Sequence, residues 1–528
     1  MSNRIRILDC TLRDGGYVNN WNFGRSRILD ICKDLSDAKV DIIEIGFLTD
    51  KEHTNEQSLY TNSSEVVDIV KFKENSLIAV MIALGEKESD PSKLSTSKET
   101  GIDIVRITFH NNESEVSRAI EYANILMNKG YKVCMQPVGT TTYTDEELLN
   151  LINKINELKP FAFYLVDTLG TLYRESLLKF VKLIDDNLDI DIRLGFHSHN
   201  NLQMSFSNNQ LLAEYDTRRN IILDSSLYGM GRGAGNLCTE LIARYLNETA
   251  NGNYLLVNIL DAIDNHIYPL SLDFQWGYNA HYYMSAIYNC HPNYSSYLMN
   301  KQTLTMEEIN ILLQNLPKEK RHLFNKELIE NLYLNFQLEP KVEGKLTDMQ
   351  YAFKDKEVLL LAPGHTITQY EDKIKDFIAE KKPIVVAINV NPKSYFIDYL
   401  FISNRKRLLS CEFDKVGGDV IITSNLPKLT NDYIVADYDI LIDNDFDQPD
   451  NAGMMMIRLL INSGVKKVYL AGFDGFTSGK VDNYFESNIA DHNTKDLAND
   501  KTLDVEKQIN KLSNIVDIEF ITPSLYKR

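Results

Sequence analysis

The chain has 528 residues, with 56 Lys and Arg against 74 Asp and Glu, so its formal net charge is −18 at pH 7. At about 150 residues per domain this length predicts roughly two to four domains. The acidity argues against nucleic-acid binding and against docking on anionic membranes, since both need clustered positive charge. We find no signal peptide and no apolar stretch of membrane-spanning length. The six cysteines are scattered without a CxxC pair, so we expect free thiols and a cytoplasmic location.

The first half alternates strand-like and helix-like segments at about thirty-residue intervals, the length of a βα unit. Amphipathic stretches predict helices, among them residues 25–39, 115–130 and 144–158, the last with a capping box at Thr144 and Glu147. Eight repeats favour a closed (β/α)8 TIM barrel over residues 1–275, although periodicity alone leaves an open doubly wound sheet as an alternative. The eight predicted strands are Ile5–Cys10, Val40–Phe47, Leu77–Leu84, Ile102–Phe109, Tyr131–Pro137, Phe161–Asp167, Ile192–His197 and Asn220–Leu227.

The second half predicts a helical appendage followed by another α/β domain. Residues 276–349 are aromatic and helical in pattern, with short helices expected at Met306–Leu316 and Lys326–Phe336. Continuous apolar runs, typical of parallel strands covered on both faces, then predict a Rossmann-like domain over residues 350–528, for which we consider a nucleotide or sugar ligand. Its predicted strands are Glu357–Ala362, Pro383–Val390, Tyr395–Ile402, Asp419–Thr423, Tyr433–Ile442 and Lys467–Gly472.

Residues with metal-binding chemistry follow the predicted barrel strands, on the face that carries the active site of such barrels. His197 and His199 are two residues apart at a strand end, so both side chains project to the same side. Asp14 follows the first strand, and two histidines with one carboxylate are a common ligand set for a divalent metal. An isolated His-x-His is more often incidental, but its position opposite Arg13-Asp14 favours a metal site.

Four motifs together resemble the DRE-TIM metallolyase superfamily of HMGL-like enzymes, closest to its 4-hydroxy-2-oxovalerate aldolase branch: Leu12-Arg13-Asp14-Gly15, Glu44, His197-x-His199 and the Gly-rich residues 231–236. The resemblance covers about the first half of the chain. It implies a divalent metal, Mn²⁺ or Mg²⁺ first and Zn²⁺ or Co²⁺ as alternatives, held by Asp14, His197 and His199, with Asn236 also able to approach it. It further implies that Arg13 stabilises an enolate oxygen while Glu44 holds Arg13, which is compatible with a structural ion pair.

The general base is left open by this resemblance. The aldolases place a histidine shortly after Arg-Asp-Gly, where this chain has Tyr17, and the lyase branch uses a cysteine that residues 227–236 lack. A phenol with a pKa near 10 needs a nearby cation to act as a base at neutral pH. We therefore expect Tyr17 in the site and leave its role as the base open. The substitutes are His53, His110, His281, Tyr282 and Tyr283.

The second half carries weaker signals at its predicted strand ends. The turn Ala362–Thr366 is compatible with phosphate binding through backbone N–H groups and equally with a tight structural turn. Arg405, Lys406 and Arg407 form a basic cluster suited to a phosphate or a nucleotide sugar, or a solvated loop. Asp474 is interpreted as a metal ligand, a ribose ligand or a turn cap. The pattern loosely resembles Rossmann-like domains of bacterial surface-polysaccharide and sialyltransferase-like proteins.

We therefore predict a metal-dependent carbon–carbon lyase. This aldolase would form or cleave a 4-hydroxy-2-oxo acid through a pyruvate-type enolate, with a 2-oxo acid and an aldehyde as partners and surface-polysaccharide precursor synthesis as a setting. An acyl-CoA-dependent Claisen-type synthase is one alternative, disfavoured because that branch tends to read Arg-Asp-Gly-Glu-Gln where this chain has residues 13–17 as Arg-Asp-Gly-Gly-Tyr. A catalytically retired barrel with a nucleotide- or sugar-binding C-terminal domain is the other. We also expect a homo-oligomer.

Overall fold

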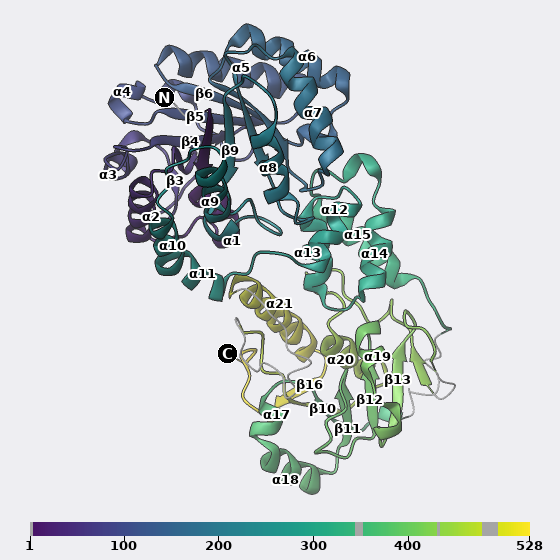
Figure 1. Cartoon of the computed structure of the whole chain (residues 1–528). Helices are drawn as coiled ribbons and strands as arrows, with labels where there is room; N and C mark the ends of the chain where they lie inside the picture. Colours follow the sequence, from purple (N-terminus) through teal and green to yellow (C-terminus); the bar gives the residue numbers. More distant parts are fainter. Residues whose placement is uncertain (1–3, 344–351, 430–432, 478–494, 528) are drawn as a thin grey trace. The chain divides into compact units, whose positions relative to one another are not determined.

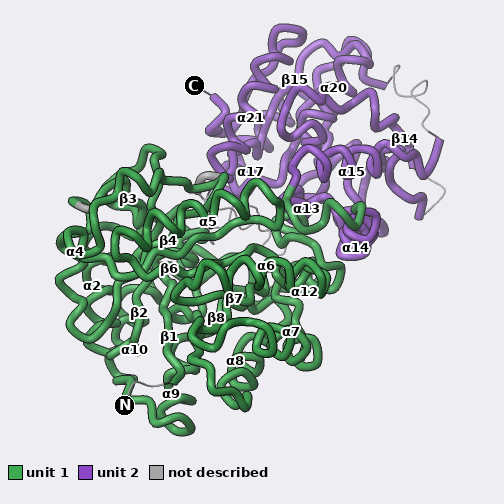
Figure 2. Tube along the Cα trace, turned by 90° about the horizontal axis from the view of Figure 1, so that it is seen from above, with its two compact units in different colours: residues 1–296, 316–324 green, residues 297–315, 325–528 purple. Residues whose placement is uncertain are grey.

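The computed structural model describes residues 4–343, 352–429, 433–477 and 495–527. The chain divides into two compact units, coloured separately in Figure 2. The first comprises Met1–Ser296 and Leu316–Phe324, and the second comprises Tyr297–Asn315 and Asn325–Arg528. The domain limits expected from the sequence, at residues 275 and 349, remain a prediction.

Eight parallel strands of the first unit close into a barrel (Figure 1). The strand order is β1-β9-β8-β7-β6-β5-β4-β2, and β1 also pairs in parallel with β2, Leu8 lying opposite Ile42. This closure confirms the TIM barrel and excludes the open sheet. A short additional strand, β3 (Leu59–Tyr60), pairs with β2 and was not predicted. The barrel strands are β1 (Ile5–Asp9), β2 (Ile42–Leu48), β4 (Leu77–Ala83), β5 (Ile104–Phe109), β6 (Lys132–Pro137), β7 (Ala162–Asp167), β8 (Arg193–Ser198) and β9 (Ile221–Ser225).

Helices follow the barrel strands and cover their outer surface. In α2, Ile28, Ile31 and Leu35 are fully buried in the core between helices and strands, as their helical spacing predicts. The capping box expected at Thr144 and Glu147 is present at the start of α6. The helices of this part are α1 (Gly16–Asn19), α2 (Arg25–Asp37), α3 (Val67–Val70), α4 (Ser97–Thr100), α5 (Glu113–Asn128), α6 (Asp145–Leu158), α7 (Arg174–Asn187), α8 (Ser205–Glu214), α9 (Thr239–Thr249), α10 (Leu256–Ala262) and α11 (Tyr268–Asp273).

The helical segment after the barrel contains α12 (Ala280–Ile287), α13 (Pro292–Lys301), α14 (Met306–Asn315) and α15 (Lys326–Leu338). The last two lie where the sequence predicts helices. Residues 292–296 of α13 belong to the first unit and residues 297–301 to the second. The chain therefore enters the second unit within a continuous helix.

The second unit contains a parallel sheet in the order β14-β13-β12-β11-β10-β15-β16. Its direction of winding reverses beside β10, as in a doubly wound Rossmann-like fold, and buried apolar clusters cover both faces. Two predicted strands are too long, because β12 begins only at Tyr399 and β14 ends at Ala436, and β16 was not predicted. The elements are β10 (Glu357–Leu361), β11 (Ile384–Ile388), β12 (Tyr399–Ile402), β13 (Asp419–Thr423), β14 (Tyr433–Ala436), β15 (Lys467–Ala471), β16 (Asp517–Phe520), α17 (Thr366–Gln369), α18 (Glu371–Lys381), α19 (Arg405–Ser410), α20 (Ala452–Asn462) and α21 (Lys495–Ser513).

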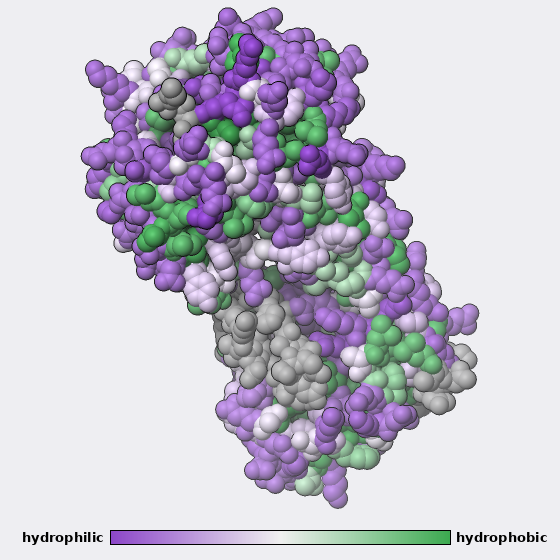
Figure 3. Space-filling view, viewed as in Figure 1, coloured by the Kyte–Doolittle hydropathy of each residue, from purple (hydrophilic) through white to green (hydrophobic). Residues whose placement is uncertain are grey.

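Polar side chains dominate the face shown in Figure 3, with apolar side chains gathered over α10 and α11. There Val257, Leu260 and Leu272 are exposed by 68%, 54% and 69%. Among the described residues, no helix is both long and apolar enough to cross a membrane.

Candidate metal centre

Asp14, His197 and His199 converge at the carboxyl ends of the barrel strands. One ligand atom from each lies within 4.8 Å of the other two, and all three side chains are buried. Asp14 lies in the turn Thr11–Gly15 after β1, whereas His197 lies on β8 and His199 directly follows it. An isolated bridge between His199 and Asn236 joins the end of β8 to the Gly-rich loop after β9. Two distant parts of the chain thus supply one compact ligand set.

The electrostatic surroundings keep Asp14 and His199 in the forms that bind a metal. Burial acts to raise the pKa of Asp14, but Arg13 and the two histidines hold that pKa well below its usual range. Burial lowers the pKa of His199 to about 3, and only the Asp14 charge opposes this. An ionised carboxylate and a neutral imidazole are the forms that bind a metal.

Asn236 also points to a metal at this position. Its Nδ2 donates to Oδ2 of Asp14 at 2.8 Å and to the Met230 carbonyl at 3.2 Å. Its Oδ1 is buried without a hydrogen-bond partner among the described residues. Such an orphaned oxygen beside a carboxylate and two imidazoles suits a hard or borderline divalent cation, so the residues present fit the metal that the sequence implies.

A buried series of ion pairs and hydrogen bonds runs from Asp14 to His197. Arg13 Nε donates to Oε2 of Glu44 at 2.8 Å, and Arg13 Nη1 donates to Asp14. The same Glu44 oxygen accepts from Arg106 Nη1 at 2.8 Å, and Arg106 Nη2 donates to Asp224. Asp224 in turn lies 3.0 Å from Nδ1 of His197. The structure therefore brings Arg13 and Glu44 together and links both to Asp14 and His197.

Tyr17 lies beside this network, and its hydroxyl contacts Glu86 and none of the proposed metal ligands. Tyr17 Oη donates to the carboxylate of Glu86 at 3.1 Å, and its ring contacts Trp21. Burial raises the pKa of Tyr17 well above its usual value, although Arg232 opposes this rise. The phenol is therefore protonated at neutral pH and does not itself act as an ionised base.

The substitutes considered for the base lie in other surroundings. His53 pairs with Glu65 and His110 with Glu115, each at 3.1 Å. Tyr282 lies on α12 with its ring 5.8 Å from that of His281, and no interaction among the described residues joins it to Asp14, His197 or His199. These side chains are not brought to the metal ligands by the contacts that the structure records.

Sequence reasoning assigned no role to five residues near the centre. Two of them carried a signal, because Arg106 and Asp224 interrupt otherwise apolar strands and both are buried. Glu86 and Lys87 lie in the loop after β4, where no local pattern marks them. Arg232 lies in the Gly-rich segment 231–236 after β9, a motif that gives this side chain no role by itself.

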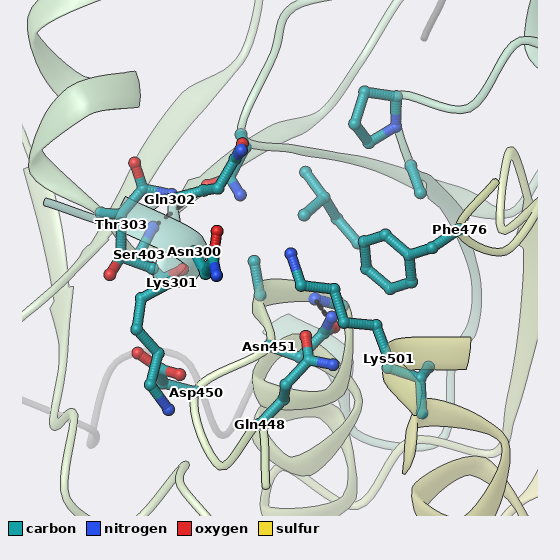
Figure 4. Close-up of a pocket in the computed structure, with 18 of the residues that line it drawn as sticks. Asn300, Lys301, Gln302, Thr303, Ser403, Gln448, Asp450, Asn451, Phe476 and Lys501 are labelled. Atoms are coloured by element: carbon teal, nitrogen blue, oxygen red, sulfur yellow. Dashed lines mark hydrogen bonds between the residues drawn. The ribbon is translucent and has the colours of Figure 1, made fainter. Parts of the chain in front are cut away.

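The second unit has a pocket of about 420 Å³ where its sheet reverses direction. Residues after β10, β11, β12 and β15 line it, together with the start of α20 and part of α21. Figure 4 shows Lys501 and Phe476 on one side of the pocket and Asn300, Thr303 and Ser403 on the other. Ligands of doubly wound sheets bind in the crevice at such a reversal.

The signals in the second half correspond to structural contacts. The Thr366 backbone N–H donates to Asp474 at 2.9 Å, and the Gly364 N–H donates to the Gly472 carbonyl at 3.1 Å. Asp474 therefore caps the turn after β10, and these N–H groups are bonded within the protein. Arg405 forms ion pairs with Glu307 at 3.1 Å and with Glu308.

Residues 4–264 match the HMGL-like family. The 4-hydroxy-2-oxovalerate aldolase 6 of Rhodococcus jostii is 28% identical over 273 residues, which are 50% of this chain and 74% of the relative. A 4-hydroxy-2-oxovalerate aldolase of Geobacillus genomosp. 3 is 27% identical over 272 residues, covering 50% and 77%. The crystal structure of the HMG-CoA lyase from Brucella melitensis aligns with 51% of this chain and 99% of its own at 14% identity and a TM-score of 0.42. The similarity to the HMGL-like family and to these aldolases is therefore carried by the barrel.

Proposed function

We propose that the barrel is a divalent-metal-dependent aldolase that forms or cleaves a 4-hydroxy-2-oxo acid, with pyruvate as the 2-oxo acid. The observation that carries this proposal is the convergence of Asp14, His197 and His199 within 4.8 Å. The two relatives named 4-hydroxy-2-oxovalerate aldolase support it. Oxygen ligands favour Mn²⁺ or Mg²⁺, and the imidazoles also admit Zn²⁺ or Co²⁺.

The charge of the buried network fits this chemistry. Asp14, Glu44 and Asp224 face Arg13 and Arg106, which leaves one negative charge when the imidazoles are neutral. An unbalanced buried charge is costly unless a counter-charge joins it. A divalent cation converts the balance to one positive charge, which complements the carboxylate of a 2-oxo acid.

Arg13 is held in a geometry that suits stabilisation of an enolate. When bound, the metal supplies Lewis-acid polarisation of the 2-oxo acid. Glu44 and Asp14 bind Nε and Nη1 of Arg13, whereas Nη2 is buried without a hydrogen-bond partner among the described residues. This donor offers a fixed positive charge to the oxygen on which negative charge develops.

We further propose that Tyr17 and Glu86 handle the proton of the 4-hydroxyl group. The Tyr17 phenol accepts the substrate proton while it passes its own proton to the Glu86 carboxylate, to which it already donates at 3.1 Å. Burial acts to raise the pKa of Glu86, but Lys87 and Arg232 lower it overall, so this carboxylate is ionised and able to accept. The phenol never needs to ionise by itself, which agrees with its raised pKa.

Deuterium exchange tests the enolate chemistry. The Mn²⁺-loaded protein is incubated with pyruvate in D2O, and loss of the methyl proton signal is followed by NMR. We expect metal-dependent exchange that falls by about 100-fold or more in Arg13→Met, because one donor at a developing oxyanion contributes about that much. Arg218→Met is the matched control, since Arg218 is exposed in the loop before β9, at the opposite end of the barrel.

Several outcomes separate the alternatives. Equal loss in both variants, or a protein that binds no divalent metal, contradicts the aldolase proposal. Release of free CoA from acetyl-CoA in the presence of a 2-oxo acid supports the Claisen-type synthase instead. If the protein binds the metal but exchanges no pyruvate protons, whether or not aldehydes are added, the result supports a catalytically retired barrel.

We infer that the pocket of the second unit binds a small polar ligand of the nucleotide or sugar class. Its volume of about 420 Å³ is within the usual range for small-molecule sites. Ser403 lines it and is 5% exposed, so Ser403→Leu should fill it, whereas Ser410→Leu on the exposed end of α19 should not. The test is the rise in unfolding temperature with added nucleotides or sugars, and equal responses in the two variants contradict the inference. A role in surface-polysaccharide precursor synthesis stays a prediction.

A further inference from the structure

Arg232 is a cation at the barrel mouth whose charge helps to keep Glu86 ionised but whose guanidinium forms no ion pair in the described part of the chain. It lies in the Gly-rich loop after β9, and its guanidinium carbon is 4.4 Å from the centre of the Tyr17 ring. Its Nη1 lies 3.1 Å from Nε2 of His291. Burial lowers the pKa of His291 to about 3, so this imidazole is neutral and adds no charge beside the guanidinium. In the described part of the chain, no carboxylate forms an ion pair with Arg232.

The loop that carries Arg232 is held firmly in place. Asn201 accepts from the Ala234 N–H at 2.9 Å, and the Gly235 carbonyl accepts from the Asn200 N–H at 2.8 Å. Gly233 has a φ of +68° and lies so close to Asn201 that a Cβ atom would approach its Oδ1 to 2.7 Å. The guanidinium is therefore positioned before any ligand arrives, which reduces the entropy lost on binding.

The other cations around Tyr17 already have carboxylate partners. Arg13 is bonded to Asp14 and Glu44. Lys87 Nζ lies 2.6 Å from Glu86 and 3.8 Å from the centre of the Trp21 ring. Arg232 differs from both because no ion pair balances its charge. The Tyr17 ring and the neutral His291 imidazole orient the guanidinium without neutralising it.

We propose that Arg232 binds an anionic group, a carboxylate or a phosphate, on the aldehyde half of the substrate. This inference rests on the proposed aldolase function. The metal ligands and Arg13 serve the 2-oxo acid half, and Tyr17 marks the hydroxyl-bearing carbon. Because Arg232 lies over the Tyr17 ring, a group attached beyond that carbon reaches the guanidinium. With a divalent cation bound, the buried network and Arg232 together carry two positive charges, which match a 4-hydroxy-2-oxo acid with two anionic groups.

The test compares aldehydes of matched length with and without a charge. The first pair is succinic semialdehyde and butanal, and the second is glyceraldehyde 3-phosphate and glyceraldehyde. Addition of pyruvate to each by the Mn²⁺-loaded full chain is followed by mass spectrometry of the product. We expect the kcat/KM ratio of the anionic to the neutral aldehyde to fall by about tenfold to hundredfold in Arg232→Met, the usual effect of one charge-assisted hydrogen bond. The aldehyde pair that gives the larger ratio in the wild type shows whether Arg232 prefers a carboxylate or a phosphate.

The effect should appear mainly in KM for the anionic aldehyde, because the contact is remote from the reacting atoms. Arg232→Lys should restore part of the preference, since it keeps the charge and loses the planar fork. Arg218→Met, which removes an exposed charge from the opposite end of the barrel, should leave the ratio unchanged. The affinities of the four aldehydes are also measured by calorimetry, so that the proposal is decided even for an aldehyde that does not react.

Two results overturn the inference. One is a wild-type protein with no preference, in turnover and in calorimetry, for either anionic aldehyde. The other is an Arg232→Met variant that loses pyruvate exchange without aldehyde at least as strongly as it loses the anionic preference, which would assign Arg232 to the 2-oxo acid half. Absence of pyruvate exchange in the wild type is a failure of the proposed function instead, so the two failures are distinguishable.

Discussion

Nδ1 of His197 lies 3.0 Å from Oδ2 of Asp224. This contact fixes the tautomer, because a proton on Nδ1 that is donated to a carboxylate leaves the lone pair on Nε2. Nε2 lies on the side of the proposed metal centre, 4.0 Å from Oδ1 of Asp14. A carboxylate behind a metal-binding imidazole orients the ring and increases its basicity, so Asp224 supports the proposed centre without being a ligand.

Asp224→Asn should weaken metal binding. The amide keeps the shape of the carboxylate but loses the charge that orients His197, and loss of such a partner usually lowers metal affinity by about 10- to 100-fold. Calorimetric titration of the metal-free protein with Mn²⁺ measures the change. Glu44→Gln is the matched control, because it removes one carboxylate from the other side of Arg106 and leaves the contact with His197. Equal losses in the two variants would assign the effect to net charge alone.

Gly231→Ala should disturb the position of Asn236. A Cβ atom at this position would lie 2.5 Å from Nδ2 of Asn236 and 3.1 Å from Oδ2 of Asp14. Asn236 must then move away, and its 2.8 Å hydrogen bond to Asp14 is lost. We expect metal affinity to fall by about tenfold, the low end of the usual effect of such supporting contacts. Gly417→Ala, whose Cβ would meet only Phe396 at 3.9 Å, should leave metal affinity unchanged, and an unchanged affinity in Gly231→Ala contradicts the proposed role of Asn236.

Tyr17→Phe should slow carbon–carbon bond cleavage by about 100-fold or more, in the range of general acid–base catalysis. Exchange of pyruvate protons should be affected less, because it does not involve the 4-hydroxyl group. Glu86→Gln removes the acceptor of the Tyr17 proton and should show the same selective loss. Rates of cleavage and exchange are measured on the same preparations. If Glu86→Gln cleaves the hydroxy acid at the wild-type rate, the proton does not pass to Glu86.

Asp9 should make stability depend on pH in a defined direction. Burial raises its pKa from 3.8 to about 6, despite hydrogen bonds from Thr11 and Thr239. The folded state therefore holds a proton that the unfolded state releases between these values, and the unfolding free energy falls as the pH rises through this window. Asp9→Asn does not titrate, so its stability relative to the wild type should increase from about pH 4 to pH 7 by at most about 3 kcal/mol.

Urea unfolding followed by tryptophan fluorescence measures the difference in unfolding free energy between Asp9→Asn and the wild type. The chain has two tryptophans, Trp21 and Trp276, and both lie in the first unit. The signal therefore reports on that unit alone, and a chelator excludes metal binding from the comparison. A difference that stays constant with pH would mean that Asp9 has an ordinary pKa in the folded protein.

Much of the fold follows from local sequence patterns. Most barrel strands are largely apolar and buried on both faces. The helices α2 and α6 carry clear apolar stripes, and α6 begins with a capping box. The patterns fail where a strand is very short or alternates charged residues with apolar ones. The strand β3 has only two residues, and β16 alternates Asp517 and Glu519 with apolar residues, so neither resembles its neighbours.

The proposed site could be predicted only in part for a related reason. Asp14, His197 and His199 could be grouped because strand ends of a barrel share one face. The contact between Arg106 and Asp224 joins residues 118 apart in the chain, and it depends on how inward-facing side chains meet inside the closed barrel. Loop residues such as Glu86 and Arg232 lie beyond the reach of periodicity, because their positions are set by turns and packing.

The continuous helix α13 and the return of residues 316–324 have a practical consequence for dividing this protein. The returning segment is bonded to the first unit, where the His291 N–H donates to the Arg321 carbonyl at 2.7 Å and the Tyr294 hydroxyl donates to the Lys320 carbonyl at 2.8 Å. A fragment that stops at Ser296 therefore lacks part of its own unit, and one that continues to Phe324 carries residues 297–315 of the other. No single cut yields both units intact, so the barrel is best studied within the full chain.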